Sequence, residues 1–525
     1  MLLSFLSLFF IKKRERKESK IPVNSNKKKG EYFLKYISTR GAAEKLDSAE
    51  AILKGIAADG GLFAPGEIPS VDLNFIEDLT KLSYEERAKK ILSLFLTDYT
   101  AEELDLCVNR AYGGDKFDHI KRAPVNVLND MSILELWHGP TSAFKDMALQ
   151  ILPELMSTAL KKTGEKSEIL ILVATSGDTG KAALAGFQDA NQIKIEVFYP
   201  NGGVSDMQRL QMVTQEGQNV KVVAVDGNFD DAQTGVKNIF ADAKFNEELL
   251  NKNIKLSSAN SINWGRLVPQ IVYYFSAYAD LIQAGRIKTG DNIDFSVPTG
   301  NFGDILAAYY AKLMGLPIGK LICASNANNV LTDFLKTGIY DRNRPFYKTI
   351  SPSMDILISS NLERLLYHTT NDASKVKGWM EELNKTGRYD VGAEVLAKLK
   401  ETFWADYTDD NGALETIKEA YNSENVTLDP HTAVAYKAAK EYKKSGGKNE
   451  IVVVSTASPY KFAKNVLLAI GESTNNIDDF EVLDLLHKKS KMPIPKGLAK
   501  LKDAEVLHKD VIAKDRMKDA VLKFV

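Results

Sequence analysis

Residues 168–187 read EILILVATSGDTGKAALAGF, a stretch with three parts. Residues 168–174 form a nearly continuous apolar run, 175–180 are rich in hydroxyl side chains and glycine, and 181–187 favour a helix. A buried strand that leads through a short polar loop into a helix is typical of a parallel sheet with helices on both faces. This stretch therefore predicts an α/β fold.

The same unit recurs after residue 130, whereas residues 31–130 have apolar residues mostly at helical spacing. The sequence predicts no strand between 361 and 445, and it predicts amphipathic, Lys-rich helices from residue 477 onward. Asp429 is a good N-cap for the helix that begins at Pro430. The further strand-like runs are MSILELW (131–137), KIEVFYP (194–200), VKVVAVD (220–226), IDFSVP (293–298), LICASN (321–326) and IVVVST (451–456).

The charge balance and the cysteine count disfavour several classes of protein. The 525 residues include 68 Lys and Arg against 69 Asp and Glu, which gives a net charge of −1. A protein whose main task is to hold nucleic acid needs a basic surface, so we expect no nucleic-acid partner. Two cysteines, Cys107 and Cys323, cannot form a disulfide framework or a cysteine-rich zinc site. We expect a cytoplasmic protein without a metal.

The first thirty residues differ from the rest of the chain. Residues 12–29 contain nine Lys or Arg and two Glu, a charge of +7 that leaves −8 for the remaining chain. The apolar run at 1–11 is shorter than the ~20 residues that cross a bilayer, and the charge lies on the wrong side for a secretory signal. A weak membrane-surface anchor is one interpretation. We favour a disordered basic extension at 1–30 and expect no stable membrane association.

Ligands of open α/β sheets bind in the loops that follow strands, and one such loop contains a lysine. HGPTSAFKD (138–146) lies between a strand and a helix and includes Lys145. Burial near a helix start disfavours the charged form of an amine and makes it a usable nucleophile or base. A lysine in this position is more often a solvated surface residue, so the assignment depends on the other loops.

Three further loops carry hydroxyl groups and glycines. Residues 175–180 and 299–304 combine glycines with a helix start, which suits a carboxylate or a phosphate. Helix capping is the plainer interpretation of such residues. Neither loop has the Walker or the G-x-G-x-x-G spacing. Residues 455–459 place a hydroxyl where it could bond a ring nitrogen or cap the next helix.

Together the four loops offer one amine, two anion sites and a hydroxyl. An imine-forming amine beside a phosphate site is what pyridoxal phosphate requires. A lysine-dependent sugar-phosphate enzyme would use the same groups. The residues by themselves therefore indicate an anionic cofactor or substrate and leave the choice open.

A resemblance to one family narrows this choice. Over about residues 31–480 the chain resembles the threonine synthases of the longer bacterial and fungal type, and STRG (38–41) with DGGLFAP (59–65) resembles their helical N-terminal domain. The further motifs, in order, are HGPTSAFKD (138–146), ATSGDTG (174–180), SINWGR (261–266), PTGNFGD (298–304), SPSMDI (351–356) and DPHTAVA (429–435).

The resemblance implies the tryptophan-synthase-β-like fold of the fold-type II pyridoxal phosphate enzymes, with two α/β subdomains and an N-terminal helical domain. We accordingly expect the N-terminal helical domain at 31–130. The smaller subdomain, with the lysine, would occupy 131–260, and the larger subdomain with C-terminal helices would occupy 261–525.

The resemblance also implies the residues that bind the cofactor. Lys145 would hold pyridoxal phosphate through its amine and move protons at the α and β carbons of the substrate. Thr456 would face the pyridine nitrogen, which leaves the ring a moderate electron sink. The cofactor phosphate would lie mainly on backbone N–H groups of Gly300, Asn301, Phe302, Gly303 and Asp304.

The implied reaction converts O-phospho-L-homoserine and water to L-threonine and phosphate, and we expect a monomer rather than a homodimer. Another fold-type II enzyme, such as threonine or serine dehydratase, and a non-catalytic metabolite-binding relative are the alternatives.

A surface ion pair is the competing interpretation of Arg266. Ser458 stands where many relatives have histidine, so no catalytic role rests on it. The expected substrate contacts are Thr175, Ser176, Asp178, Thr179, Ser261 and Arg266.

Overall fold

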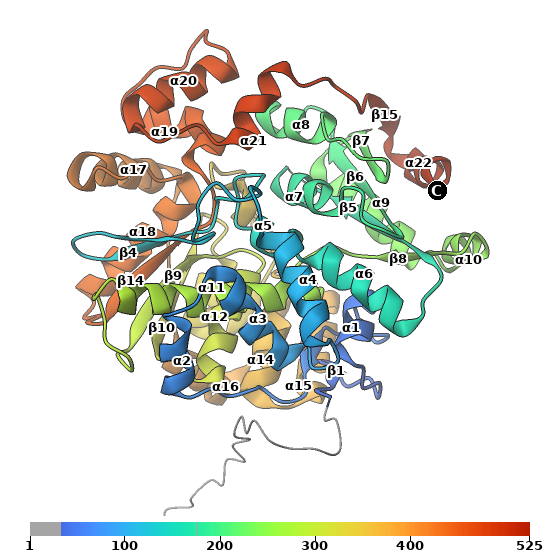
Figure 1. Cartoon of the computed structure of the whole chain (residues 1–525), viewed down its shortest axis with the longest axis horizontal. Helices are drawn as coiled ribbons and strands as arrows, with labels where there is room; N and C mark the ends of the chain where they lie inside the picture. Colours follow the sequence, from blue (N-terminus) through green and yellow to red (C-terminus); the bar gives the residue numbers. More distant parts are fainter. Residues whose placement is uncertain (1–32, 176) are drawn as a thin grey trace, which may run out of the picture.

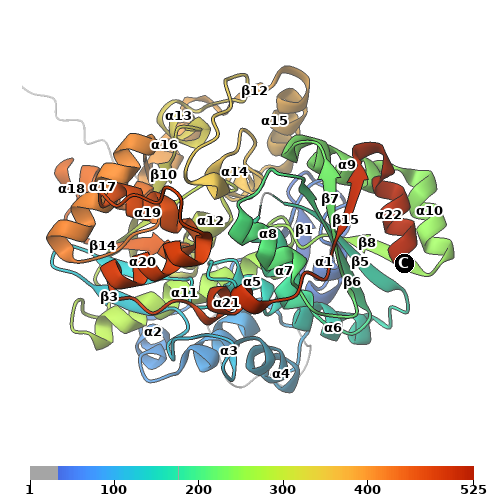
Figure 2. The same ribbon diagram turned by 90° about the horizontal axis from the view of Figure 1, so that it is seen from above.

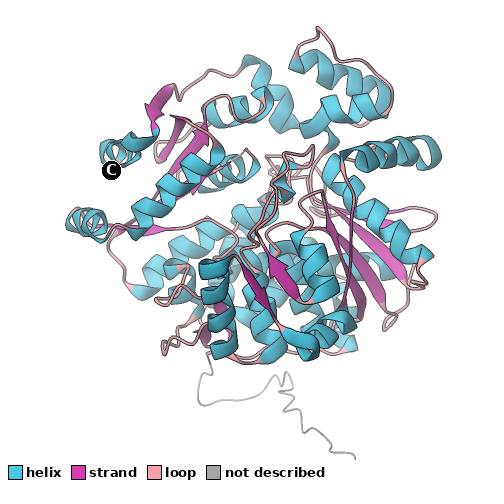
Figure 3. Cartoon of the chain, turned by 180° about the vertical axis from the view of Figure 1, so that it is seen from behind, coloured by secondary structure: helices cyan, strands magenta, loops and turns pink. Residues whose placement is uncertain are grey.

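The computed structural model describes residues 33–175 and 177–525, and two sheets dominate this part of the chain (Figures 1 and 3). The extension expected at 1–30 lies outside the described residues. The larger sheet is parallel except for its antiparallel edge strand β3. Its strand order is β13 (Phe403–Tyr407), β10 (Ile318–Ser325), β9 (Ile293–Pro298), β14 (Glu450–Ser455), β4 (Ser132–Glu135) and β3 (Val125–Val127).

The smaller sheet is parallel throughout. All seven runs that the sequence predicts as strands are strands, and the predicted α/β class is confirmed. Two short antiparallel pairs accompany the sheets, β1 (Tyr36–Ser38) with β2 (Phe63–Pro65) and β11 (Ile339–Asp341) with β12 (Arg388–Asp390). The strand order of the smaller sheet is β15 (Asp510–Ala513), β7 (Val220–Asp226), β6 (Ile193–Pro200), β5 (Glu168–Ala174) and β8 (Ile254–Ser257).

Helices cover both faces of each sheet, as continuous apolar strands require. One face of the smaller sheet packs on α6 (Leu152–Thr163), α7 (Asp178–Phe187) and α8 (Asp206–Val213), and the other on α9 (Phe229–Ala241), α10 (Ala243–Asn251) and α22 (Met517–Phe524). One face of the larger sheet packs on α11 (Trp264–Gln283) and α12 (Gly303–Met314), and the other on α17 (Asp410–Glu424), α18 (Pro430–Lys444), α19 (Ala463–Ala469) and α20 (Asp479–Ser490).

Shorter helical segments complete the described chain. The N-terminal region is helical as expected, with α1 (Ser48–Lys54), α2 (Leu73–Leu79), α3 (Tyr84–Phe95) and α4 (Ala101–Tyr112). The remaining α-helices are α5 (Asp146–Leu149), α13 (Val330–Thr337), α14 (Leu362–Thr370), α15 (Ala373–Thr386), α16 (Gly392–Thr402) and α21 (Lys496–Ala499).

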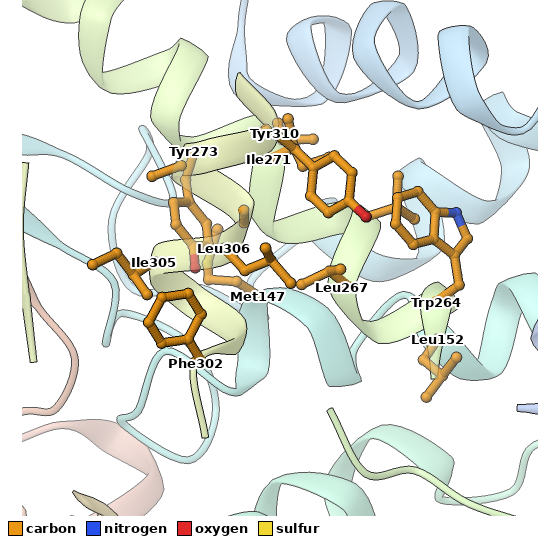
Figure 4. Close-up of a cluster of buried hydrophobic side chains, with 14 of the residues drawn as sticks. Met147, Leu152, Trp264, Leu267, Ile271, Tyr273, Phe302, Ile305, Leu306 and Tyr310 are labelled. Carbon is orange, nitrogen blue, oxygen red and sulfur yellow. The ribbon is translucent and has the colours of Figure 1, made fainter. Parts of the chain in front are cut away.

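Helix α11 lies at the centre of the molecule. It is apolar around nearly its whole circumference, and such a helix is stable only when neighbours cover every side. The N-terminal helix α3, the short helix α5 and helix α12 all pack against it. Figure 4 shows part of this core, in which Trp264 and Tyr310 lie together with Leu267 and Ile271 of α11.

Three strands contradict the sequence-based expectations. β12 and β13 lie in the segment expected to lack a strand, and they pair with β11 and β10 respectively. β15 lies in the segment expected to be helical, and it pairs with β7. All three are short strands with residues that alternate between more and less buried, so their apolar signal is weak.

Three strands cross the expected domain boundaries. β3, from the expected N-terminal domain, and β4, which precedes residue 261, belong to the larger sheet, and β15 follows residue 261 but belongs to the smaller sheet. Seen from above, the chain after α20 passes from the larger to the smaller sheet through α21 (Figure 2). The boundaries 31–130, 131–260 and 261–525 stay predictions.

Within the described residues no helix is long and apolar enough to cross a membrane, and no group of three or more His, Cys, Asp or Glu side chains is suited to a metal ion.

The expected N-cap of α18 is confirmed, because the Asp429 carboxylate accepts from the His431 and Thr432 N–H groups.

The close approach of α7 to α5 gives a test of the packing. A Cβ on Gly186 would lie 1.9 Å from the Leu149 carbonyl oxygen, so Gly186→Ala must move one helix. We expect it to lower stability by about 1–3 kcal/mol, the usual effect of overpacking. Gly378→Ala in exposed α15 is the matched control, because nothing lies within 4 Å of its added Cβ. Thermal unfolding of both variants checks this, and equal melting temperatures would contradict it.

Candidate active site

Backbone hydrogen bonds between two loops hold Lys145 in place. The Phe144 N–H donates to the Thr456 carbonyl at 2.8 Å, and the Ser458 N–H donates to the Ser142 carbonyl at 3.0 Å. They fix the loop after β4 against the loop after β14, and these two strands are neighbours in the larger sheet. The lysine therefore follows directly on a segment bonded to Thr456.

The amine of Lys145 is buried, with 8% of the residue exposed. Its Nζ donates to the Ser353 hydroxyl at 3.2 Å and lies 3.6 Å from Oδ2 of Asp178. Burial lowers the pKa of this amine to about 8, although the charge of Asp178 acts in the opposite direction. The positive charges of Lys461 and Arg266 lower the pKa further. Near neutral pH the amine is neutral far more often than an ordinary lysine, which suits a nucleophile or a base.

Asp178 is surrounded by cations and donors. Lys461 Nζ lies 2.7 Å from its Oδ1, and the Gln208 side chain donates to the same oxygen at 3.2 Å. Burial alone would raise the pKa of this carboxyl, but the charges of Lys461 and Lys145 hold it well below its usual range. An ionised carboxylate repels an anionic substrate group. A direct substrate contact of Asp178 stays a prediction, and its charge argues against it.

The loop before α12 has the backbone shape of an anion site. Phe302 is in the left-handed conformation, with φ +62°, and it precedes the first residue of the twelve-residue helix α12. A Cβ on Gly300 would lie 3.0 Å from the Met354 Cα and 3.2 Å from the Ser353 carbonyl oxygen. The loop is thus packed tightly on one side, and N–H groups at the helix start point toward a ligand position.

The side chain of Asp304, in the same loop, is used internally. Its Oδ1 accepts from the Tyr273 and Tyr274 hydroxyls, both at 2.6 Å. Burial raises the pKa of this carboxyl to about 6, and the two tyrosine hydrogen bonds oppose the rise. Its Oδ2 has no hydrogen-bond partner within the described residues. The part of Asp304 that suits a phosphate is therefore its backbone.

The loop after β5 uses one of its hydroxyls to shape itself. The Thr175 Oγ1 accepts from the N–H groups of Gly177 and Gly180, both at 3.0 Å. Thr179 is half-buried at the start of α7. Ser176, a predicted substrate contact, lies outside the described residues. The substrate roles of these residues stay predictions.

Arg266 and Ser261 lie at the start of α11, on the inner side of the molecule. Only 5% of Arg266 is exposed, and its Nη1 donates to the Ala259 carbonyl at 2.8 Å. Burial lowers the pKa of its guanidinium to about 10, while Tyr273 acts in the opposite direction. Among the described residues no carboxylate lies within 4.0 Å of Arg266, so the surface ion pair is not formed. Ser261 accepts from the Asn361 amide at 3.1 Å.

The sequence analysis missed three residues that contact the lysine–aspartate pair, namely Ser353, Lys461 and Gln208. Ser353 lies in the motif SPSMDI, and Lys461 follows the loop that contains Thr456. Ser353 is separated from Lys145 by 208 positions, so spacing could not bring them together. The motif was a usable signal for Ser353. Lys461 is buried within a run that reads as an ordinary helix start, so the sequence gave no signal for its role.

A cleft of about 810 Å³ opens between the two sheets and reaches this group of charges. One wall comes from residues 202–208 after β6, and the other from 346–355 and 460–465. Gln208 and Lys461 both line it, and both contact Asp178. The cleft thus reaches two residues that bind Asp178, the carboxylate beside Lys145.

Two α/β sheets around a central helix, with a buried lysine between an anion loop and a hydroxyl, define the pyridoxal-phosphate-dependent enzymes of fold type II. The family model "Pyridoxal-phosphate dependent enzyme" matches residues 128–392. The model "Threonine synthase N terminus" matches 35–112, and "Threonine synthase, C-terminal" matches 432–522. The chain belongs to the threonine synthase family.

Individual relatives agree with this family. Threonine synthase of Schizosaccharomyces pombe is 39% identical over 86% of this chain and 92% of its own length. Threonine synthase-like 1 of Homo sapiens is 41% identical over 85% of this chain, and the chain spans only 61% of that relative's length.

Solved structures show the same fold. Pyridoxal-phosphate-bound threonine synthase from Brucella melitensis has a TM-score of 0.83 and 37% identity, covering 94% of this chain and 99% of that one. Threonine synthase from yeast has a TM-score of 0.83 and 36% identity, covering 94% and 98%. The expected tryptophan-synthase-β-like fold is confirmed.

The residues present fit pyridoxal phosphate. Lys145 supplies a buried amine with a lowered pKa, and the loop at 300–304 supplies a tight glycine turn at a helix start. Thr456 lies beside Lys145 through the backbone bonds of the two loops. The fold thus brings together an amine, an anion site and a hydroxyl group. The individual contacts of these groups with the cofactor stay predictions.

The Gly300 position gives a test of the anion loop. We expect Gly300→Ala to weaken pyridoxal phosphate binding, because the added Cβ must displace the backbone of residues 353–354. The loss of one charge-assisted hydrogen bond, about 1.5–3 kcal/mol, would weaken binding about 10- to 100-fold. Gly378→Ala in exposed α15 is the control, since nothing lies within 4 Å of its added Cβ and it is outside the anion loop. Cofactor titration by absorbance decides, and equal affinities would contradict the assignment.

Proposed function

We propose that the protein is a threonine synthase, which converts O-phospho-L-homoserine and water to L-threonine and phosphate. The observation that carries this proposal is Arg266, a buried guanidinium whose charge acts on the Lys145 amine and which has no carboxylate partner among the described residues. A site with one phosphate needs only the loop at 300–304. A second phosphate, on the substrate, gives the arginine an anion to bind bidentately.

The chain's own residues supply binding and proton transfer. When bound, pyridoxal phosphate supplies an electron sink for negative charge at the substrate carbons beside the amino group. Lys145 removes protons from the α and β carbons of the substrate, which requires an amine that is partly neutral near pH 7. The γ carbon gains a proton once the phosphate has left, the β carbon gains the hydroxyl group of water, and the α carbon regains its proton. Backbone N–H groups at the start of α7 hold the substrate carboxylate. Arg266 and Ser261 orient the substrate phosphate and stabilise its charge as it leaves.

We also infer a monomer that works in the cytoplasm. Both cysteines, Cys107 and Cys323, are free and buried, which supports a reducing compartment. Sedimentation of the purified protein tests the monomer, and cell fractionation tests the compartment.

The substrate assay is the most direct test of the reaction. We expect release of phosphate and formation of threonine from O-phospho-L-homoserine, and no turnover of free threonine or serine. Turnover of free threonine alone would support a dehydratase instead. A protein without lysine-bound cofactor and without either activity would support a non-catalytic binding protein.

Lys145→Ala is expected to abolish both turnover and the visible absorbance of lysine-bound pyridoxal phosphate, since the reacting amine is removed. Lys237→Ala, at an exposed position of α9, is the control and should change neither. Retained turnover in Lys145→Ala would contradict the assignment of the amine.

Arg266→Gln is expected to raise KM for O-phospho-L-homoserine by about 30-fold or more, because truncating a buried charged partner costs about 2–5 kcal/mol. Arg266→Lys keeps the charge and should lose less. Cofactor affinity, measured in parallel, should stay unchanged. A loss of cofactor affinity with unchanged KM would show that the arginine serves the cofactor phosphate.

A further inference from the structure

The Asp178 carboxylate has a different partner group on each of its two oxygens. On one side, Oδ1 receives Lys461 Nζ at 2.7 Å and the Gln208 amide at 3.2 Å. On the other side, Oδ2 accepts from the Ser353 hydroxyl at 3.2 Å and lies 3.6 Å from Lys145 Nζ. Asp178 belongs to the smaller sheet's α7, whereas Lys461 follows β14 of the larger sheet. One carboxylate thus joins the two halves of the site.

Ser353 is itself fixed from behind. Its backbone N–H donates to His431 Nε2 at 3.1 Å, and His431 Nδ1 lies 2.8 Å from an Asp429 carboxylate oxygen. The histidine therefore carries its proton on Nδ1 and accepts on Nε2. This chain of bonds sets the position of Ser353, so its hydroxyl accepts from Lys145 and donates to Asp178.

We propose that Ser353 and Asp178 form a receiving site for the Lys145 amine while it is not bonded to the cofactor, and that Lys461 is the positioning residue that holds Asp178 there. The proposal rests on the proposed function, because a lysine that both holds the cofactor and moves protons must be released from it in each turnover. The released ammonium needs a partner inside a buried site, and the Asp178 carboxylate supplies one.

Asp178 stabilises the ammonium and does not take its proton. Its pKa stays well below the usual range because of Lys461 and Lys145, so it remains ionised at all working pH values. The two neighbours of the amine then act in opposite directions: Asp178 raises the pKa of Lys145 and Lys461 lowers it. The charged groups that act on the amine are Asp178 of α7, Lys461 after β14, Arg266 of α11 and Asp304 of α12.

The test measures how fast Lys145 captures added pyridoxal phosphate as a function of pH, from the visible absorbance of the full chain freed of cofactor. The rate should rise with pH around a midpoint near the pKa of about 8. Asp178→Asn should move the midpoint down by about one pH unit, and Lys461→Met should move it up. Lys461→Arg should restore it. Ser353→Ala should move it in the same direction as Asp178→Asn, but by less, and Ser353→Thr should restore it.

Lys461→Met removes the nearest cation from the buried Asp178 carboxylate, so a second variant guards against a loss of folding. The double variant Asp178→Asn/Lys461→Met removes both charges, and its midpoint should lie between those of the two single variants. Asp280→Asn is the matched control, because Asp280 is a buried carboxylate paired with Arg87 at 2.7 Å in another part of the molecule. It should leave the midpoint unchanged.

Shifts in the same direction for Asp178→Asn and Lys461→Met, or midpoints equal to the wild type in both, would overturn the proposal. An equal shift in Asp280→Asn would overturn it as well, since the effect would then be general. Cofactor capture needs no substrate. A protein that fails with O-phospho-L-homoserine but shows the opposite shifts would refute the proposed function and retain the receiving site.

Discussion

The burial of helix α11 is the constraint on which the rest of the structure depends. An all-round apolar helix of twenty residues must be covered on every side, and three separate regions of the chain cover it. The N-terminal helices α2 and α3, the short helix α5 and helix α12 all pack against it. The apolar contacts in Figure 4 therefore also fix the parts that carry Lys145 and the anion loop.

The polar groups in the first half of α11 are directed to the site, whereas Ser276 and Asp280 further along bind Arg87. Arg266 stands at its first turn, and Tyr273 and Tyr274 bind Asp304 of the anion loop. A chain with a charge of −8 outside its basic N-terminal segment thus has cations concentrated where anions bind. The total charge gave no hint of this arrangement, because it depends on where Arg266, Lys461 and Lys145 are buried.

The sequence predicted those parts of the molecule whose signal is local. Interior parallel strands are apolar throughout, and Asp429 caps its helix through its nearest neighbours. Edge strands such as β13 and β15 are half-exposed, so their patterns resemble loops or helices. The Ser353 and Lys461 contacts join positions far apart in the chain, and no local pattern encodes them. The family motifs pointed to Lys145 and its loops. The hydrogen bonds that position these loops can be identified only in the folded structure.

The last strand of the smaller sheet has a consequence for how the protein is made. β15 and α22 complete the sheet and its outer core, and Lys514 contacts Asp231, which lies 283 positions earlier. During synthesis the edge of β7 and the apolar face of α9 are made long before their partners. They must stay unpaired, or be shielded by other proteins, until this late segment leaves the ribosome. The smaller sheet therefore completes its strand pairing only after β15 has been made.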